Sequence, residues 1–284
     1  MNDRVRVEVT DGIADVRLCR PEKRNALDQP MFEGLVQAGR DLSADPSVRV
    51  AVLHGEGPAF CSGLDFMSFA AMMSGNLTAD SDEVQRAVQD KTEGGASWFQ
   101  LPAWTWYEAP FPVIAAVQGA AYGAGLHIAL GADMRIVAPD AKLAFVEVNW
   151  GLVPDMSGSQ ALRRLVPLDV AKRMAMTGLP IDGEEAERLG LATEVSATPY
   201  QRARELAAVI AQKSPDAVRA IKRLLNQSAL VPLAEGLDME FQCSGALMGT
   251  PNQLEAIGAS FEKRRPRFED PEFAPSTSVD SRDH

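Results

Sequence analysis

The chain has 284 residues, of which 46% are hydrophobic and 24% charged, an ordinary composition for a soluble globular protein. This length allows one large domain, or one domain with a helical extension. The net charge of −11 argues against nucleic-acid binding, which needs a basic face, but a few local Lys and Arg side chains can still hold an anionic small ligand.

No feature of the sequence predicts export, a membrane span or a metal site. The three cysteines, Cys19, Cys61 and Cys243, have neither disulfide-framework nor metal-ligand spacing. The amino-terminal residues are charged and alternating, where an export signal needs an apolar run. Segment 109–132 has no charge and is long enough to span a bilayer, but prolines and glycines interrupt it. We therefore expect a cytoplasmic protein in which this segment is a buried strand followed by a buried helix.

The first predicted elements are a hairpin, a helix and a strand. Residues 5–10 and 13–18 alternate with period two around Asp11-Gly12, which predicts two antiparallel strands. Apolar residues between 31 and 42 have helical spacing, and this helix ends near residue 45. Residues 49–55 form a continuous apolar strand that ends in glycine. The chain thus opens with strand, strand and helix before a further strand.

The rest of the chain divides into a mixed part and a helical part. After a polar, methionine-rich insertion up to about residue 100, the order strand, turn and helix recurs over 112–139 and 141–166. Beyond Pro167 the strand pattern fades and successive helices follow. We predict an α/β core of repeated β-β-α units over 1–200, a helical region over 201–267 and a flexible tail over 268–284.

The stretch "GPAFCSGLDF" places Cys61 and Ser62 side by side, but neither has the surroundings of a nucleophile. There is no G-x-S-x-G elbow, and the histidines offer no triad. Cys61 is typical of a small buried side chain. A strand that ends at this turn can instead point the Ser62 N–H outward as a free donor.

A second backbone donor is predicted where Gly123, Ala124 and Gly125 precede the buried helix, because the first N–H groups of a helix have no partner within it. Two donors that converge on one oxygen form an oxyanion hole, which suits enolate chemistry on a carbonyl. Taken alone, each glycine-rich stretch is equally typical of a tight turn.

Five motifs in order, "RPEKRNALD", "GPAFCSGLDF", "PVIAAVQGAAYGAGLHIALGADMRIV", "AFVEVNWGLVPDMSGSQALRRL" and "ASFEKRRPRF", resemble the crotonase (enoyl-CoA hydratase/isomerase) superfamily along nearly the whole chain. The resemblance implies a crotonase-like spiral of β-β-α units with a C-terminal helical trimerisation region. It also implies an acyl-CoA substrate, no further cofactor and no metal, and a homotrimer or a dimer of trimers. By motif position, the oxyanion donors are the N–H groups of Ser62 and Ala124.

The same resemblance implies a set of substrate-binding residues: Arg24, Ala26, Leu64, Asp65, Phe66, Gly123, Trp150 and Lys263. Most of them line the coenzyme A site through their backbone, with Lys263 near the phosphates. Lys263 alone is equally typical of a solvated cation at a helix end. An apolar pocket wall, or ordinary core or lid packing, is expected of a further group: Met67, Met72, Met73, Trp104 and Trp106.

The catalytic positions depart from the family's hydratase pattern, which uses two glutamates on one water. Glu147 stands at the second position, but His127 stands at the first. Asp155, eight residues after Glu147, has the spacing of the dienoyl-CoA isomerases, in which one carboxylate removes a proton and the other returns one farther along the acyl chain. Those isomerases have an aspartate at the position of His127, so that pattern is also incomplete here.

Three functions stay open on the sequence alone. Double-bond isomerisation by Glu147 and Asp155 is slightly favoured, hydration by Glu147 and His127 is the second hypothesis, and a catalytically silent acyl-CoA-binding trimer is the third. Each residue also has a structural alternative: Asp155 as a helix cap, Glu147 as a surface strand residue, and His127 as a hydrogen-bonded histidine within its helix.

Overall fold

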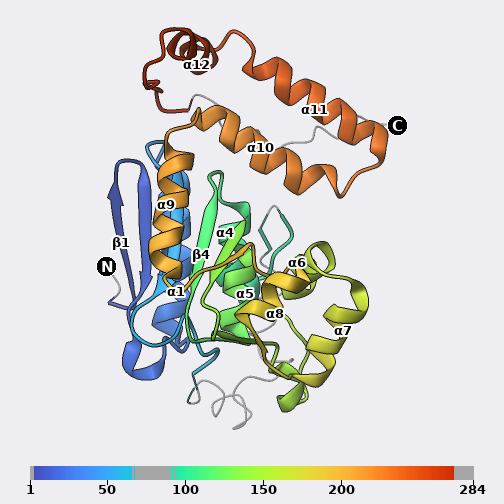
Figure 1. Ribbon diagram of the computed structural model, residues 1–284. Coiled ribbons are helices and arrows are strands. Elements are labelled where there is room, and N and C mark those ends of the chain that lie inside the picture. Colours follow the sequence, from blue (N-terminus) through green and yellow to red (C-terminus); the bar gives the residue numbers. More distant parts are fainter. Residues whose placement is uncertain (1–2, 66, 68–90, 93, 272–284) are drawn as a thin grey trace.

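The amino-terminal elements form as the alternation predicts. A computed structural model describes residues 3–65, 67, 91–92 and 94–271 of the chain (Figure 1). Strands β1 (Val5–Thr10) and β2 (Ile13–Leu18) pair antiparallel, and Asp11 and Gly12 both have positive φ at the turn between them. Helix α1 (Gln29–Ala44) follows, and its N-cap Asp28 accepts a hydrogen bond from the Met31 N–H at 3.0 Å.

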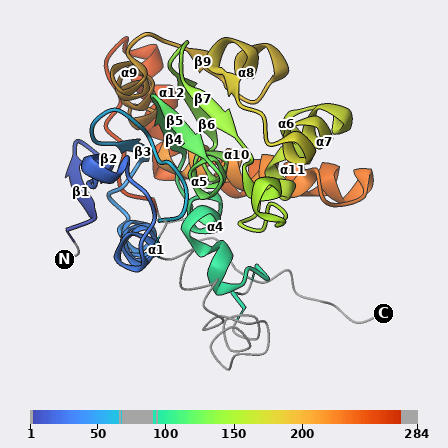
Figure 2. The same cartoon turned by 90° about the horizontal axis from the view of Figure 1, so that it is seen from below.

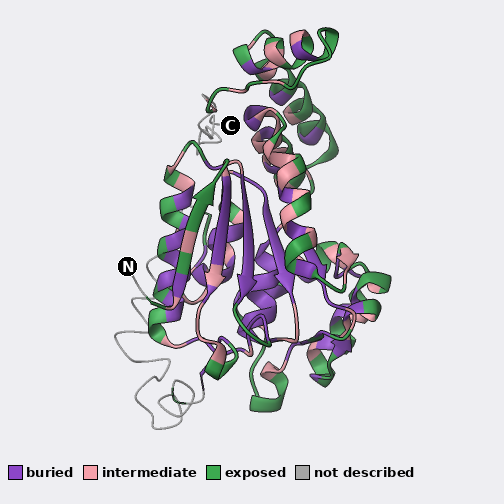
Figure 3. Cartoon of the chain, turned by 60° about the vertical axis from the view of Figure 1, so that its left-hand side comes forward, coloured by how far each residue is buried: buried purple, intermediate pink, exposed green. Residues whose placement is uncertain are grey.

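The main sheet has six strands in the order β1-β2-β3-β4-β6-β9. The four strands after the hairpin are β3 (Val50–Gly55), β4 (Val113–Val117), β6 (Met134–Val137) and β9 (Glu194–Val195). From β2 onward all neighbours are parallel, so the carboxyl ends of these strands lie together at one edge of the sheet. Strands β3 and β4 are buried along their whole length (Figure 3).

A smaller sheet follows the carboxyl edge of the main sheet. It consists of β5 (Ala120–Tyr122), β7 (Lys142–Ala144) and β8 (Ile181–Asp182). Cys61 forms an isolated parallel bridge with Ala121 of β5, and its N–H donates to the Ala120 carbonyl at 3.0 Å. The turn after β3 is thereby fastened to the strand that precedes the second predicted donor.

Helices cover both faces of the main sheet (Figure 2). One face packs against α1, α4 (Leu101–Glu108) and α5 (Ala124–Gly131), and every residue of α5 is buried. The other face packs against α9 (Pro199–Ala211), where Ala203 and Ala207 contact the strands. The uncharged segment 109–132 therefore forms a buried strand and a buried helix, and no helix in the described part of the chain is long and apolar enough to cross a membrane.

Three short helices before α9 and several single 3-10 turns complete the described core. The helices are α6 (Gly158–Leu165), α7 (Leu168–Thr177) and α8 (Gly183–Leu189). Single 3-10 turns occur at Pro21–Lys23, Trp98–Gln100 and Glu147–Trp150. The predicted continuous strand around Glu147 ends at Ala144, so Glu147 opens a 3-10 turn instead.

The last helices, α10 (Pro215–Ser228), α11 (Leu233–Leu247) and α12 (Pro251–Phe261), leave the core at the amino ends of the strands (Figure 1). The Lys222 ammonium of α10 donates to the carbonyls of Trp106 and Phe111, at 3.1 and 2.9 Å, just before β4. Helix α9 packs on the main sheet, and α10 is the first of the C-terminal helices to leave it.

Part of the predicted flexible tail is attached to the core. The Arg49 guanidinium donates to the Phe268 carbonyl at 3.4 Å and pairs with Asp270 at 3.0 Å. The Glu269 N–H donates to Asn252 of α12 at 2.9 Å. Residues 268–270 thus close over the amino end of β3, and residues 272–284 lie outside the described part of the chain.

Candidate functional site

The two predicted donor turns meet at the carboxyl edge of the sheet. A Cβ placed on Gly63 would lie 2.9 Å from the Tyr122 carbonyl oxygen and 4.0 Å from the Ala124 nitrogen. The Tyr122 N–H donates to the Cys61 carbonyl at 3.1 Å. The stretches "CSG" and "YGAG" are therefore packed against each other, as a shared oxyanion site requires.

The two donors differ in their present partners. Ala124 is the first residue of α5, so its N–H has no acceptor within the helix. The Ser62 N–H donates to the Arg24 carbonyl at 3.0 Å. Arg24 and Asn25 both have left-handed backbone, with φ of 50° and 56°, and this turn brings the carbonyl to Ser62. A thioester oxygen that binds the Ser62 N–H therefore has to share this donor with the Arg24 carbonyl or displace that carbonyl.

The side chains of Cys61 and Ser62 do not point to nucleophilic chemistry. Cys61 is fully buried, and burial raises the pKa of its thiol to about 12, which disfavours the thiolate that would attack. The Ser62 hydroxyl donates only to the Lys23 carbonyl, at 3.3 Å. Among the described residues, no base forms a hydrogen bond with either side chain.

Glu147 lies beside the second donor turn. A Cβ on Gly123 would be 3.3 Å from Glu147 Oε1, and Gly123 has φ 48°, a conformation that other residues rarely adopt. Oε1 is 2.9 Å from His127 Nε2. Oε2 is buried and has no hydrogen-bond partner among the described residues. The Glu147 carboxylate thus lies beside an oxyanion donor, where such a group can accept a proton from a bound ligand.

His127 is a buried residue of α5 with both ring nitrogens engaged. Its Nε2 contacts Glu147, and its Nδ1 accepts a hydrogen bond from the Gly158 N–H at 2.9 Å. The ring is 0% exposed and meets the edge of Phe145. In this arrangement His127 faces protein on every side and contacts the site through Glu147.

Asp155 lies in the loop that leads into α6. The N-cap of α6 is Ser157, so Asp155 is not the helix cap that its sequence position allowed. The residue is exposed as a whole, yet partial burial of the carboxyl raises its pKa, and the negative charge of Glu147 acts in the same direction.

The predicted coenzyme A residues mostly surround the first turn. Ala26 is buried, and its carbonyl accepts a hydrogen bond from Arg20 at 3.0 Å. Leu64 is 43% exposed and Asp65 is buried. Hydrogen bonding from the Met67 N–H and from Arg20, 2.8 Å away, lowers the pKa of Asp65. The side chain of Asp65 therefore fixes the loop and leaves ligand contact to the backbone.

Other predicted ligand residues have different positions. Arg24 is exposed next to the Ser62 turn, and Trp150, at the end of the 3-10 turn that Glu147 opens, is 56% exposed. Phe66, Met72 and Met73 lie outside the described residues. Met67 is exposed, whereas Trp106 is fully buried in the core, as the packing alternative required.

Lys263 is not brought to the site by its own chain. It follows α12, which is attached near α10 and Arg49 at the amino ends of the strands (Figure 1). Ser62 and Ala124 follow the carboxyl ends of β3 and β4 in the chain. Strand β3 alone has six residues, about 20 Å of extended chain, so Lys263 follows a helix at the opposite end of the sheet from the two donor turns.

Two residues that organise the site were not predicted. Buried Asn25 donates from its side-chain amide to the carbonyls of Glu56 and Ala59, at 2.9 and 2.8 Å, and so holds the turn after β3. Arg20 joins the Ala26 carbonyl to Asp65. Both belong to the motif "RPEKRNALD", but nothing in their spacing shows that they bind residues some 30 to 45 positions away.

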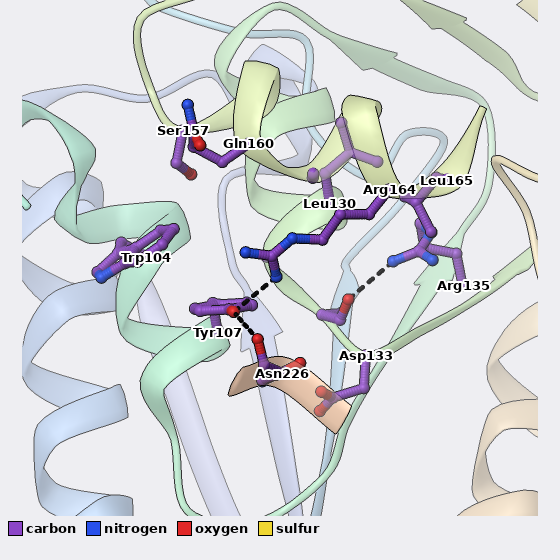
Figure 4. Close-up of a pocket in the computed structure, with 13 residues that line it drawn as sticks. Trp104, Tyr107, Leu130, Asp133, Arg135, Ser157, Gln160, Arg164, Leu165 and Asn226 are labelled. Carbon is purple, nitrogen blue, oxygen red and sulfur yellow. Dashed lines mark hydrogen bonds between the residues drawn. The ribbon is translucent and has the colours of Figure 1, made fainter. Parts of the chain in front are cut away.

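A pocket of about 130 Å³ lies beyond the far end of α5, between α4 and α6 (Figure 4). The guanidinium of Arg164 donates to the Tyr107 hydroxyl at 2.6 Å and lies 5.2 Å from the centre of that ring. Leu130 and Trp104 form apolar walls. None of the predicted catalytic residues lines this pocket, so it is separate from the Glu147 site.

The described residues contain no group of three or more His, Cys, Asp or Glu side chains that could hold a metal ion. The available chemistry is that of backbone donors and carboxylates. A free N–H beside an unpartnered carboxylate can stabilise an enolate while a proton is removed. Asp155, with its raised pKa, can hold a proton to higher pH than an ordinary aspartate.

Comparison with known proteins agrees with this geometry. The family model described as enoyl-CoA hydratase/isomerase matches residues 8–271. An enoyl-CoA isomerase/hydratase of Mycosarcoma maydis is 30% identical over 268 residues, which cover 90% of this chain and 92% of that protein. The mouse mitochondrial methylglutaconyl-CoA hydratase is also 30% identical over 268 residues, covering 92% of this chain and 81% of the relative.

The fold agrees as well. The crystal structure of an enoyl-CoA hydratase from Bacillus anthracis superposes with a TM-score of 0.84 at 30% identity, covering 94% of this chain and all of that one. The predicted crotonase-like fold is thus confirmed, and the chain is a crotonase-type enzyme. The chain belongs to the enoyl-CoA hydratase/isomerase family.

Proposed function

We propose that the chain moves a double bond within an enoyl- or dienoyl-CoA thioester. The observation that carries the proposal is the difference between the surroundings of two carboxyl groups. Glu147 has a buried Oε2 without a partner, and Asp155 has a pKa that burial raises. Two carboxyl groups whose environments differ in this way are suited to act as base and acid in one reaction.

The reaction begins with the thioester oxygen at the Ala124 N–H, with the Ser62 N–H as second donor once the Arg24 carbonyl shares or leaves it. Glu147 Oε2 takes a proton from the carbon next to the thioester, so that a C–H bond breaks and an O–H bond forms. The electron pair spreads over the enolate and its conjugated double bond.

In the second step Asp155 gives its proton to a carbon farther along the acyl chain. An O–H bond breaks at Asp155, a C–H bond forms on the substrate, and the enolate electrons return to the thioester carbonyl. The substrate thus gains and loses one proton and no atoms are added. Proton exchange with solvent returns Glu147 and Asp155 to their starting states.

Hydration of a 2-enoyl-CoA is the second candidate, and the hydratases among the relatives favour it. Glu147 would activate the water, with His127 as its partner. The 2.9 Å contact between His127 and Glu147 agrees with such a pair. The burial of His127 does not, because hydration requires the second partner to contact the water or the substrate carbon.

A direct comparison of substrates tests the proposal. The purified chain is given 2-enoyl-, 3-enoyl- and 3,5-dienoyl-CoA esters side by side in deuterated water, and mass spectrometry follows each product. We expect isomeric products with shifted double bonds that carry deuterium at the distal carbon to which Asp155 delivers its proton. Rapid formation of a 3-hydroxyacyl-CoA, with no shifted double bond from any ester, would instead establish the hydratase.

A further inference from the structure

His127 is connected to the site only through hydrogen bonds whose direction can be assigned. The Gly158 N–H is a backbone donor and has no accepting form, so His127 Nδ1, 2.9 Å away, must be the acceptor. A neutral imidazole with an unprotonated Nδ1 carries its proton on Nε2. That proton points to Glu147 Oε1, which is also 2.9 Å away.

The surroundings of the ring maintain this arrangement. A Cβ on Gly158 would lie 2.5 Å from Nδ1, so only glycine lets the backbone N–H approach the ring this closely. Phe145 meets the ring edge-on, with centroids 5.2 Å apart. The ring is 0% exposed, which leaves neither nitrogen free for water or substrate.

The hydrogen bond also fixes the carboxylate of Glu147. Oε1 accepts from His127 and lies beside the Gly123 turn, whereas Oε2 is buried without a partner among the described residues. A donor on one oxygen of a carboxylate restricts its rotation. The proposed base is therefore held in one orientation beside the second donor turn.

We propose that His127 is a positioning residue: its neutral ring, oriented by the Gly158 N–H, donates from Nε2 to Glu147 and fixes the orientation of this carboxylate as the base, and no proton passes between His127 and the substrate. This inference rests on the proposed function only in that Glu147 is the base. It applies equally if Glu147 acts on a water in hydration.

The protonation of the ring can be measured without any substrate. The chain has three histidines, so ¹⁵N NMR of histidine-labelled full-length protein gives few signals, and their absence in His127→Gln assigns those of residue 127. We expect one protonated and one unprotonated nitrogen, with the proton on Nε2. A proton on Nδ1, or on both nitrogens, would overturn the proposal.

Two substitutions separate positioning from proton transfer. Glutamine cannot act as an acid or base, but its amide can donate to Glu147 and accept from Gly158, whereas leucine can do neither. A hydrogen bond to a charged group is worth about tenfold to a hundredfold in rate, so His127→Leu should lose that factor in exchange of the proton next to the thioester. His127→Gln should recover most of the loss.

If His127→Gln is as inactive as His127→Leu while both unfold at the temperature of the parent chain, His127 transfers a proton and the proposal is wrong. Should the leucine variant not fold, the glutamine variant and the NMR measurement still decide. A parent chain that exchanges the proton but shifts no double bond would contradict the isomerase and leave the proposal on His127 intact.

Discussion

Gly125 of α5 packs directly on the peptide group of Cys61. A Cβ at position 125 would overlap the Cys61 carbonyl oxygen and lie 2.9 Å from the Cys61 Cβ. The two donor turns come from segments some 60 residues apart, and this contact sets the distance between them. The contact leaves no room for a side chain at position 125. This explains why the motif has glycine here, although the residue lies in a helix.

Gly125→Ala should therefore impair both folding and activity. The methyl group has to displace backbone, and overpacking of this kind costs about 1–3 kcal/mol. Gly258→Ala in α12 is the matched control, because a Cβ there meets nothing within 4 Å and alanine is the better helix former. Thermal unfolding should show a lower midpoint for the first variant and an equal or higher one for the second. A Gly125→Ala protein as stable as its parent would mean that the turns are not in contact.

Cys61→Ala and Ser62→Ala should leave turnover largely intact. The Ser62 N–H remains in either variant, and the loss of one oxyanion donor would cost about a hundredfold or more. The fully buried Cys61 thiol, with its pKa raised to about 12, should also resist alkylation by iodoacetamide at pH 8 in the folded protein. Peptide mass mapping before and after denaturation checks this. A hundredfold loss of turnover in a folded variant would show that a side chain takes part in the chemistry.

The order of elements could be read from the sequence because each depends on local pattern. Alternation around Asp11-Gly12 gave the hairpin, and the glycine turn before the buried α5 gave the position of Ala124. The sequence also allowed Glu147 to be a surface strand residue, since the apolar residues on either side of it suit a strand as well as the 3-10 turn that it opens. Only the structure shows that pairing stops at Ala144.

The connections within the site could not be predicted, because they join residues far apart in sequence. His127 meets Gly158, 31 residues away, and Asn25 holds the Ala59 carbonyl, 34 residues away. The engagement of the Ser62 N–H by Arg24 also depends on two left-handed residues that are not glycine. The helical periodicity predicts α12. Its place at the amino ends of the strands depends on a hydrogen bond made by α10 and on an ion pair of Arg49, which the sequence does not show.

Lys222→Met should detach the helical region from the core. The buried ammonium joins two backbone carbonyls and pairs with Asp133 at 2.8 Å, so its removal leaves Asp133 without this partner. Breaking a buried pair in this way costs about 3–5 kcal/mol. Lys213→Met, at an exposed position beyond α9, is the control and should change stability by less than about 0.5 kcal/mol. Urea unfolding of both variants measures the difference, and equal midpoints would contradict the role given to Lys222.

We expect the chain to assemble as a trimer or a dimer of trimers through the helical region. Large apolar side chains are exposed there, among them Leu233 at 80%, Phe241 at 79% and Phe261 at 84%, more than a monomer usually leaves in water. Phe241→Asp should shift the mass toward the monomer in light scattering, whereas Glu240→Asp, on the same helix, should not. A parent chain that is monomeric at micromolar concentration would contradict this expectation.

The two carboxyl groups should have separable effects. Glu147→Gln should abolish exchange of the proton next to the thioester, because the buried base is lost. Asp155→Asn should retain that exchange and stop migration of the double bond, since only distal proton delivery is lost. The hydratase alternative predicts the opposite: Asp155→Asn would be nearly silent. Deuterium incorporation and product formation, measured separately by mass spectrometry, distinguish the two.

The pH dependence gives a second test of Asp155. Burial, with the negative charge of Glu147, raises the pKa of its carboxyl, so the folded chain keeps this proton at a pH where the unfolded chain has lost it. The contribution of this group to the free energy of unfolding is therefore complete at a pH below the pKa of an ordinary aspartate. It is lost as the pH rises from there through the raised pKa of Asp155 in the folded chain. Isomerisation should fall over the same window, because the protonated form is the acid. Asp155→Asn should remove this decline in stability, and an isomerase whose rate and alkaline limb were unchanged by Asp155→Asn would show that another group delivers the distal proton.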